Sequence, residues 1–148
     1  MVSKTLKTSL LLLTLVCSLF IFSCKKSSTP TVTPQQFFET NVIDQSHVVN
    51  LATDRGTDVT FNYNGYTFRI NKTTPLNGSF VAANNLFSVT GTWVITSDYE
   101  QITFNLPTAQ SSFAFFNRAW KFTNRSAPIF ELVPVDNTDI KVLRFQKQ

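Results

Sequence analysis

The sequence has few of the residues on which most catalytic and metal sites depend. Its 148 residues include one histidine, two cysteines and four glycines. A single histidine without paired thiols excludes the common zinc patterns, and so few glycines leave no glycine-rich phosphate loop. No Ser-His-Asp set stands out around His47, which we expect at a strand edge or on the surface. The sequence therefore predicts no metal ion, no cofactor and no enzymatic activity.

Acidic residues are also few, and none of them forms a dense cluster. Three pairs lie close together in the sequence: Asp54 with Asp58, Asp98 with Glu100, and Asp136 with Asp139. None has the oxygen spacing of a calcium loop, and the middle pair flanks a tyrosine at an expected turn. We interpret these residues as turn caps and solvated acids.

Basic charge is concentrated at the start of the chain. The net charge is +4, but four of the 13 lysines and arginines precede Ser27. From Ser27 onward, nine basic residues balance nine acidic ones. A neutral domain lacks the basic surface that nucleic-acid binding requires, so we expect no nucleic-acid partner.

Long apolar runs are missing except for one near the N-terminus. Lys4 and Lys7 precede the apolar segment Leu10 to Phe22. This segment is shorter than the roughly 20 apolar residues that a membrane-spanning helix needs. Charge followed by a short apolar run is typical of a signal peptide, which we assign to residues 1–23.

The segment Ile21-Phe22-Ser23-Cys24 resembles a bacterial lipobox. The resemblance implies that Cys24 becomes the first mature residue and carries acyl chains that hold the protein on a membrane. Cys17 is a poorer candidate because it lies inside the apolar run. Residues 24–33 are polar and contain proline, so we expect a flexible tether. We expect a lipid-anchored envelope protein, on the outer membrane facing the periplasm, and leave surface exposure open.

Residues 34–148 have the length of one domain. Thr33-Pro34-Gln35-Gln36 has the form of a capping box with proline at the first helical position. The pattern predicts a short helix from Pro34 to about Ile43, which we expect to pack on the rest of the domain.

A period of two dominates from His47 to the C-terminus. Strand-like segments occupy 47–53, 61–63, 66–71, 79–83, 86–97, 100–106, 119–123, 129–133 and 140–146. Turn residues separate most of them, including Asn64-Gly65, Asn77-Gly78 and Asp136-Asn137. Eight or nine short strands without long helices between them predict an antiparallel all-β barrel or sandwich.

The Asn64-Gly65 dipeptide allows two interpretations. As a two-residue hairpin turn it would pair Tyr63 with Tyr66, which aligns residues 58–63 with 66–71. Alternatively, the residues before Gly65 form a loop that leads into a strand beginning at Tyr66.

Aromatic residues are abundant, with 15 phenylalanines and two tryptophans. Alternation places Phe87, Val89, Trp93 and Ile95 on one face of their strand, and most aromatic residues must form the core. Phe113-Ala114-Phe115-Phe116 lies in a connection, either as a short helix that closes one end of the barrel or as an aromatic surface.

Several motifs, in order, resemble the small lipocalin-like lipoproteins of Gram-negative envelopes. They are Asp54-Arg55-Gly56, Gly65-Tyr66-Thr67-Phe68, Gly91-Thr92-Trp93 with Ile95-Thr96-Ser97, Phe113 and Phe116 before Trp120, and Leu143-Arg144-Phe145. The resemblance covers Val48 to Lys147. It implies an up-and-down barrel of about eight strands, a bend or a crowded contact at Gly91, and no catalytic residues.

Two functions are consistent with these expectations. In the first, the barrel binds a small apolar ligand in a lumen lined by aromatic side chains, for which the candidates are Phe68, Phe87, Trp93, Phe104, Phe113, Phe116 and Trp120. In the second, the barrel is filled and presents its surface to another envelope protein. A packed interior would favour the second function, and exposed aromatic residues around Phe113 would also favour it.

Overall fold

Antiparallel pairing between consecutive strands builds the fold, as the short connections predict. The computed structural model describes residues 31–107, 111–136 and 138–148. Its helical elements are the α-helix α2 (Pro34–Asn41) and the 3-10 helices η1 (Thr60–Tyr63) and η2 (Ser111–Phe115). Its strands are β1 (Ser46–Asp54), β2 (Thr57–Asp58), β3 (Thr67–Thr74), β4 (Asn77–Ala83), β5 (Ser88–Ile95), β6 (Gln101–Asn105), β7 (Ala119–Ser126), β8 (Ile129–Pro134) and β9 (Lys141–Lys147).

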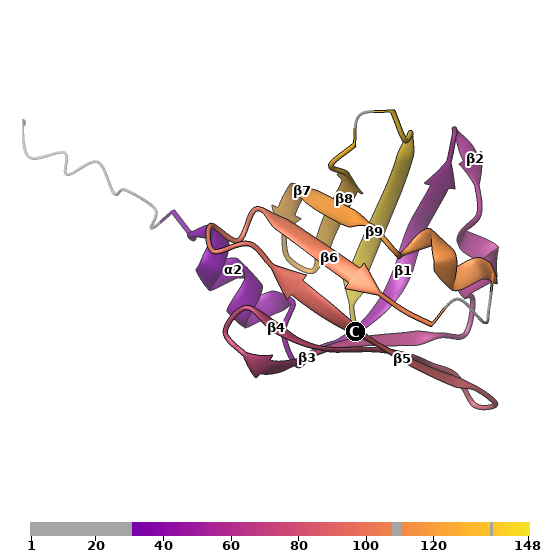
Figure 1. Cartoon of the computed structure of the whole chain (residues 1–148), viewed down its shortest axis with the longest axis horizontal. Helices are drawn as coiled ribbons and strands as arrows, with labels where there is room; N and C mark the ends of the chain where they lie inside the picture. Colours follow the sequence, from indigo (N-terminus) through magenta and orange to yellow (C-terminus); the bar gives the residue numbers. More distant parts are fainter. Residues whose placement is uncertain (1–30, 108–110, 137) are drawn as a thin grey trace, which may run out of the picture. The chain divides into compact units, whose positions relative to one another are not determined.

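Strand β1 closes the sheet because it pairs on both sides. Near its start His47 pairs with Phe68 of β3, and along its length it pairs with β9 as far as Asp54 and Lys141. Strands β1 and β3–β9 therefore form a closed antiparallel barrel of eight strands (Figure 1). The all-β, up-and-down prediction is confirmed, and a barrel replaces the sandwich alternative. Strand β2 is a short addition that pairs only with the end of β1.

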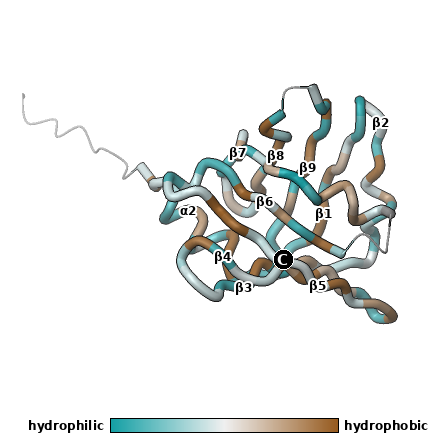
Figure 2. Tube along the Cα trace, viewed as in Figure 1, coloured by the Kyte–Doolittle hydropathy of each residue, from teal (hydrophilic) through white to brown (hydrophobic). Residues whose placement is uncertain are grey.

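Alternating side chains fill the barrel interior, as the period of two predicts. A bulge between Val49 and Leu51 shifts this alternation in β1, so that Val49 and Ala52 both face inward. The buried residues of β3–β9 are Phe68, Ile70, Phe80, Ala82, Trp93, Ile95, Ile102, Phe104, Trp120, Phe122, Phe130, Leu132, Pro134, Leu143 and Phe145. Along the chain, apolar and polar residues alternate in Figure 2 accordingly.

Helix α2 closes one end of the barrel. The capping box is present: the Thr33 hydroxyl accepts from the Gln36 amide at 3.2 Å, and the Gln36 side chain accepts from the Thr33 amide at 3.1 Å. Phe38 is 1% exposed, and its ring centroid lies 5.4 Å from that of Trp93. The predicted short helix is confirmed, and its apolar side packs on the domain. Residues Val32–Gln148 form one compact unit with its own core, so we expect it to fold alone.

The segment Phe61–Tyr63, which the sequence predicts as a strand, lies in helix η1. The hairpin interpretation of Asn64-Gly65 is also wrong, because β3 pairs with β1 and β4 and not with residues 58–63. Instead, a loop leads into β3, which is the alternative interpretation. Tyr63 accounts for the difference, since its ring is buried and its hydroxyl donates to the Ser112 carbonyl at 2.9 Å.

The predicted turn at Asn77-Gly78 is also wrong, because both residues lie in strand β4. The chain reverses earlier, around Pro75 and Leu76, between β3 and β4. Gly78 serves a different purpose: a Cβ atom there would collide with the Asn71 carbonyl and approach the Trp93 indole nitrogen to 2.8 Å. Gly91 is similarly crowded against the Asn105 carbonyl, as the family resemblance implies.

Candidate functional site

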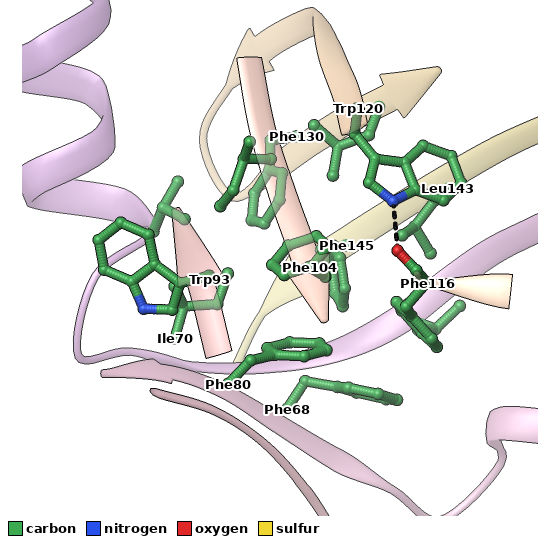
Figure 3. Close-up of a cluster of buried hydrophobic side chains, with 14 of the residues drawn as sticks. Phe68, Ile70, Phe80, Trp93, Phe104, Phe116, Trp120, Phe130, Leu143 and Phe145 are labelled. Atoms are coloured by element: carbon green, nitrogen blue, oxygen red, sulfur yellow. Dashed lines mark hydrogen bonds between the residues drawn. The ribbon is translucent and has the colours of Figure 1, made fainter. Parts of the chain in front are cut away.

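Six of the seven aromatic residues predicted to line the lumen lie inside the barrel. Each is at most 1% exposed, and most are drawn in Figure 3: Phe68, Trp93, Phe104, Phe113, Phe116 and Trp120. They come from five different elements or their flanks, so the fold brings together residues that are up to about fifty positions apart. The interior assignment is correct for these six residues.

Phe87 is the exception, since its side chain is 57% exposed. Strand β5 begins at Ser88, so Phe87 belongs to the turn after β4. The alternation that places Trp93 and Ile95 inside does not extend to a residue outside the strand. The prediction that Phe87 lines the lumen is therefore wrong.

The interior aromatic rings pack against one another. Phe80 and Phe104 stack with centroids 4.4 Å apart, and Phe68 lies 5.9 Å from Phe80. Phe116 lies 5.4 Å from Phe68, and 6.2 Å from Phe145. These separations are those of direct aromatic contact. The rings thus occupy the part of the lumen that they were predicted to offer to a ligand (Figure 3).

Helix η2 closes the barrel end opposite α2. Phe113 and Phe116 are buried, and the centroid of Phe116 lies 5.6 Å from that of Phe80. Phe115 is 9% exposed and packs 5.6 Å from Trp120. The short-helix interpretation of this aromatic cluster is confirmed, and the aromatic-surface alternative is wrong.

The polar atoms of the interior aromatic residues are occupied by backbone groups. The Trp93 indole N–H donates to the Asn71 carbonyl at 2.9 Å, and the Trp120 indole N–H donates to the Phe116 carbonyl at 2.9 Å (Figure 3). Lumenal sites usually fix a ligand through a few free polar groups. These two indoles offer none, because their single donors are already used.

His47 is fully buried, which contradicts the prediction of an edge or surface imidazole. A closed barrel has no free edge at β1, and alternation turns His47 inward with Val49. Its Nε2–H donates to the Val42 carbonyl at 3.0 Å, and its ring meets Phe130 edge-on with centroids 5.3 Å apart. Burial lowers the pKa of His47 below its ordinary value, although the hydrogen bond to Val42 opposes the shift.

Charged side chains gather at the barrel end that η2 closes. We call Asp54, Tyr63, Arg118, Asp139 and Lys141 the rim cluster. The Lys141 ammonium lies 2.6 Å from Asp54 Oδ1 and 2.8 Å from Asp139 Oδ1. Arg118 forms an ion pair with the same Asp139 and donates from Nε to the Phe115 carbonyl at 3.0 Å. The two cations and two anions therefore neutralise one another.

The environment of the rim cluster shifts the pKa of several of its groups. The hydrogen bond from Lys141 lowers the pKa of Asp54 below its ordinary value. Burial raises the pKa of Tyr63 and lowers that of Arg118. None of these shifts changes a protonation state at neutral pH. Tyr63 remains a neutral hydroxyl, and the Asp54 carboxylate remains ionised.

A cavity of about 320 Å³ opens beside the rim cluster. Its lining residues are Asp54, Val59, Asn62, Tyr63, Ser112, Ala114, Phe115, Arg118 and Lys141. Lys141 Nζ also lies 5.7 Å from the centroid of the Phe115 ring, which places apolar and charged surface side by side. The cavity has the size of a small-molecule pocket or of one side chain of a partner, and charged groups could exchange ion pairs with its occupant.

Asp58, Asp98 and Asp136 cap local turns, as the sequence predicts, whereas Glu100 forms an ion pair with Arg125 at 2.9 Å. Asp58 Oδ1 accepts from the Thr60 amide at 2.8 Å, and Asp136 Oδ1 accepts from the Thr138 amide at 2.9 Å. Asp98 Oδ1 accepts from the Glu100 amide at 3.0 Å. Within residues 31–107, 111–136 and 138–148, no group of three or more histidine, cysteine, aspartate or glutamate side chains is placed to hold a metal ion.

Sequence reasoning missed the rim cluster as a site. The sequence indicates only turn caps at Asp54 and Asp139, and no pattern in it marks Arg118 or Lys141. The feature that brings the cluster together is the pairing of Asp54, the last residue of β1, with Lys141, the first residue of β9. This pairing depends on barrel closure between strands 87 positions apart, which no local pattern reveals.

The predicted signal peptide, Cys24 and most of the tether lie outside the residues that the structure describes, as does Asn137 of the predicted Asp136-Asn137 turn. In the part of the chain that is described, no helix is long and apolar enough to cross a membrane. No family model matches the chain, and no curated protein or solved structure shows significant similarity to it.

Proposed function

We propose that this protein is a non-enzymatic lipoprotein of the bacterial cell envelope whose lipocalin-like barrel serves as an interaction module and not as a carrier. The observation that carries the proposal is the filled interior. Phe68, Phe80, Phe104 and Phe116 contact one another where a carrier would hold its ligand. A barrel of eight strands is just wide enough for side chains to fill it, which is consistent with this use of the lumen.

The barrel end around η1 and η2 provides a surface to which a partner protein could bind. The rim cavity lies there, with Arg118 and Lys141 held in place by carboxylates. Exposed large apolar residues lie in the connections beside η1 and β9: Phe61, Val135 and Ile140. A mixture of exposed apolar side chains and preorganised charge is typical of a protein-binding surface.

The membrane attachment in this proposal rests on the sequence. Ile21-Phe22-Ser23-Cys24 has the lipobox form, and acyl chains on Cys24 would hold the mature chain on the outer membrane, facing the periplasm. The Cys24→Ala variant should carry no covalent lipid, which mass spectrometry of the purified chain measures. A variant that still carries lipid would contradict the assignment of Cys24.

Site-specific photo-crosslinking in cells tests the interaction surface. A photoreactive residue at Asn62, which lines the rim cavity, should give a discrete crosslinked product with another envelope protein. The matched control position is Lys121, which is exposed on the barrel wall in β7. Equal crosslinking at both positions, or none at Asn62, would contradict a partner at the rim.

A further inference from the structure

The turn that joins β4 to β5 exposes two large apolar side chains next to each other. Leu86 is 82% exposed and Phe87 is 57% exposed. In Figure 1 this hairpin reaches past the neighbouring strands, and Figure 2 shows apolar residues near its tip. Keeping such side chains in water is unfavourable by about 25 cal/mol for each Å² of apolar surface. The tip is therefore suited to a contact that removes it from water.

The tip holds a fixed conformation without help from solvent. Asn84 Oδ1 accepts from the Leu86 amide at 2.9 Å and from the Phe87 amide at 2.7 Å. The Asn84 amide donates to the Phe87 carbonyl at 2.9 Å. Burying unpaired backbone groups in an apolar medium costs several kcal/mol. Because Asn84 bonds the Leu86 and Phe87 amides and the Phe87 carbonyl, the cost of moving the tip out of water is lower.

The whole hairpin is free of charge. Between Lys72 and Asp98 the chain contains no lysine, arginine, aspartate or glutamate. The exposed residues on the outer face of β5 are small or uncharged, for example Thr90, Thr92 and Val94. A charged side chain within the hairpin would oppose entry into lipid, and residues 73–97 contain none.

These features fit a lipid surface better than a protein partner. Directional recognition of a protein normally uses free hydrogen-bonding or charged side chains around an apolar anchor. At this tip the Asn84 side chain is used internally, and Asn85 is the one exposed polar side chain between Asn84 and Phe87. An uncharged apolar tip whose Leu86 and Phe87 amides are already bonded matches the interfacial region of a bilayer.

We propose that Leu86 and Phe87 insert into the interfacial region of a lipid bilayer, so that the β4–β5 hairpin is a membrane-contact element distinct from the predicted acyl anchor. The inference does not depend on the rim partner or on Cys24. Because the hairpin carries no charge, its attraction to the bilayer is hydrophobic. Binding requires no anionic lipid and changes little with ionic strength.

Vesicle flotation of residues 25–148, which lack the acylation site, tests the proposal. The protein should float with phosphatidylcholine vesicles, and the double variant Leu86→Ser, Phe87→Ser should lower its partition coefficient at least about tenfold. The matched control is Ile140→Ser, which removes an apolar side chain of similar exposure, 69%, from another connection at the same end. It should change partitioning less than about twofold.

A depth measurement locates the contact. The Phe87→Trp variant should show blue-shifted emission with vesicles, and bromine-labelled acyl chains should quench it. Trp93 and Trp120 are fully buried and supply a constant background. Absence of vesicle binding, binding that survives the double serine variant, or binding that requires anionic lipid would each overturn the proposal. Crosslinking from position 87 to an envelope protein, without vesicle binding, would also overturn it and assign the tip to that protein.

Discussion

The indole nitrogen of Trp93 lies 2.9 Å from the carbonyl oxygen of Asn71, across the intervening strand β4. Gly78 lies between them in β4, where it pairs with Trp93. The hydrogen bond therefore exists only because the residue between its partners has no side chain. One buried tryptophan is fixed in this way to a strand that is not its direct neighbour.

Replacing this glycine should destabilise the domain. The Gly78→Ala substitution places a Cβ atom against the Asn71 carbonyl and the Trp93 indole. We expect the free energy of unfolding to fall by roughly 1–3 kcal/mol, as for other overpacked sites. Urea unfolding followed by Trp fluorescence measures the change. Ser88→Ala, at an exposed position of β5, is the control and should leave the unfolding midpoint nearly unchanged.

Acidification should destabilise the fold through His47. Burial lowers its pKa below 6.5 in the folded state, so the unfolded chain binds the proton first as the pH falls. The contribution of neutral His47 is fully present above pH 6.5 and is lost progressively as the pH falls below that value toward the folded pKa. Urea unfolding between about pH 7.5 and 5 measures this loss.

The His47→Gln variant is the comparison for that measurement. Its amide can still donate toward the Val42 carbonyl, but it does not titrate. The pH dependence between about 7.5 and 5 should therefore be weaker than in the parent protein. Equal slopes in the two proteins would contradict a buried neutral imidazole at position 47.

Lys141 should hold the rim cluster together. Lys141→Met leaves Asp54 without its ammonium partner and Asp139 with only Arg118. We expect a loss of roughly 1–2 kcal/mol, since the lysine is largely buried but Asp54 is partly exposed. The pKa of Asp54, followed by NMR, should rise toward its ordinary value, because the lysine hydrogen bond is the main cause of its low pKa.

A more exposed lysine provides the control for the rim. Lys72 pairs with Glu39 at 2.8 Å, and both side chains are about one third exposed. Lys72→Met should destabilise the fold less than Lys141→Met, because an ion pair exposed to water contributes little to stability. A loss at Lys141 no larger than the loss at Lys72 would show that the rim cluster contributes no more than an ordinary surface pair.

Phe116→Ala should create a cavity where the parent barrel is filled. Phe116 contacts Phe68, Phe80 and other rings and is fully buried. We expect the free energy of unfolding to fall by about 3–5 kcal/mol. Because apolar cavities of this kind bind small apolar molecules, benzene should raise the melting temperature of the variant but not of the parent. Exposed Phe61→Ala is the matched control and should show neither effect.

Much of the fold follows from local patterns in the sequence. The period of two predicts every barrel strand, and the capping box predicts α2. Local patterns fail where burial depends on distant partners. The sequence predicts an edge position for His47. The side chain is buried instead, because β1 pairs with both β3 and β9. Apolar residues also recur in Phe61–Tyr63, but Tyr63 is committed to η2 through Ser112, which favours a 3-10 turn.

The candidate site could be predicted only in part, for the same reason. The interior aromatic residues of the strands follow from alternation, which breaks down at Phe87 because that residue is in the turn. The rim cluster joins residues from β1, η1, β9 and the connections beside β7 and β9. Such a set becomes visible only once the barrel closes, since no spacing in the sequence relates its members.

Native mass spectrometry of residues 25–148, purified from its own kind of cell, tests the filled barrel most directly. If aromatic side chains occupy the lumen, the spectrum should show the mass of the polypeptide alone, and extraction should release no stoichiometric small molecule. An apolar compound bound at about one molecule per chain, and displaced by competing lipid, would contradict the filled barrel and favour a carrier.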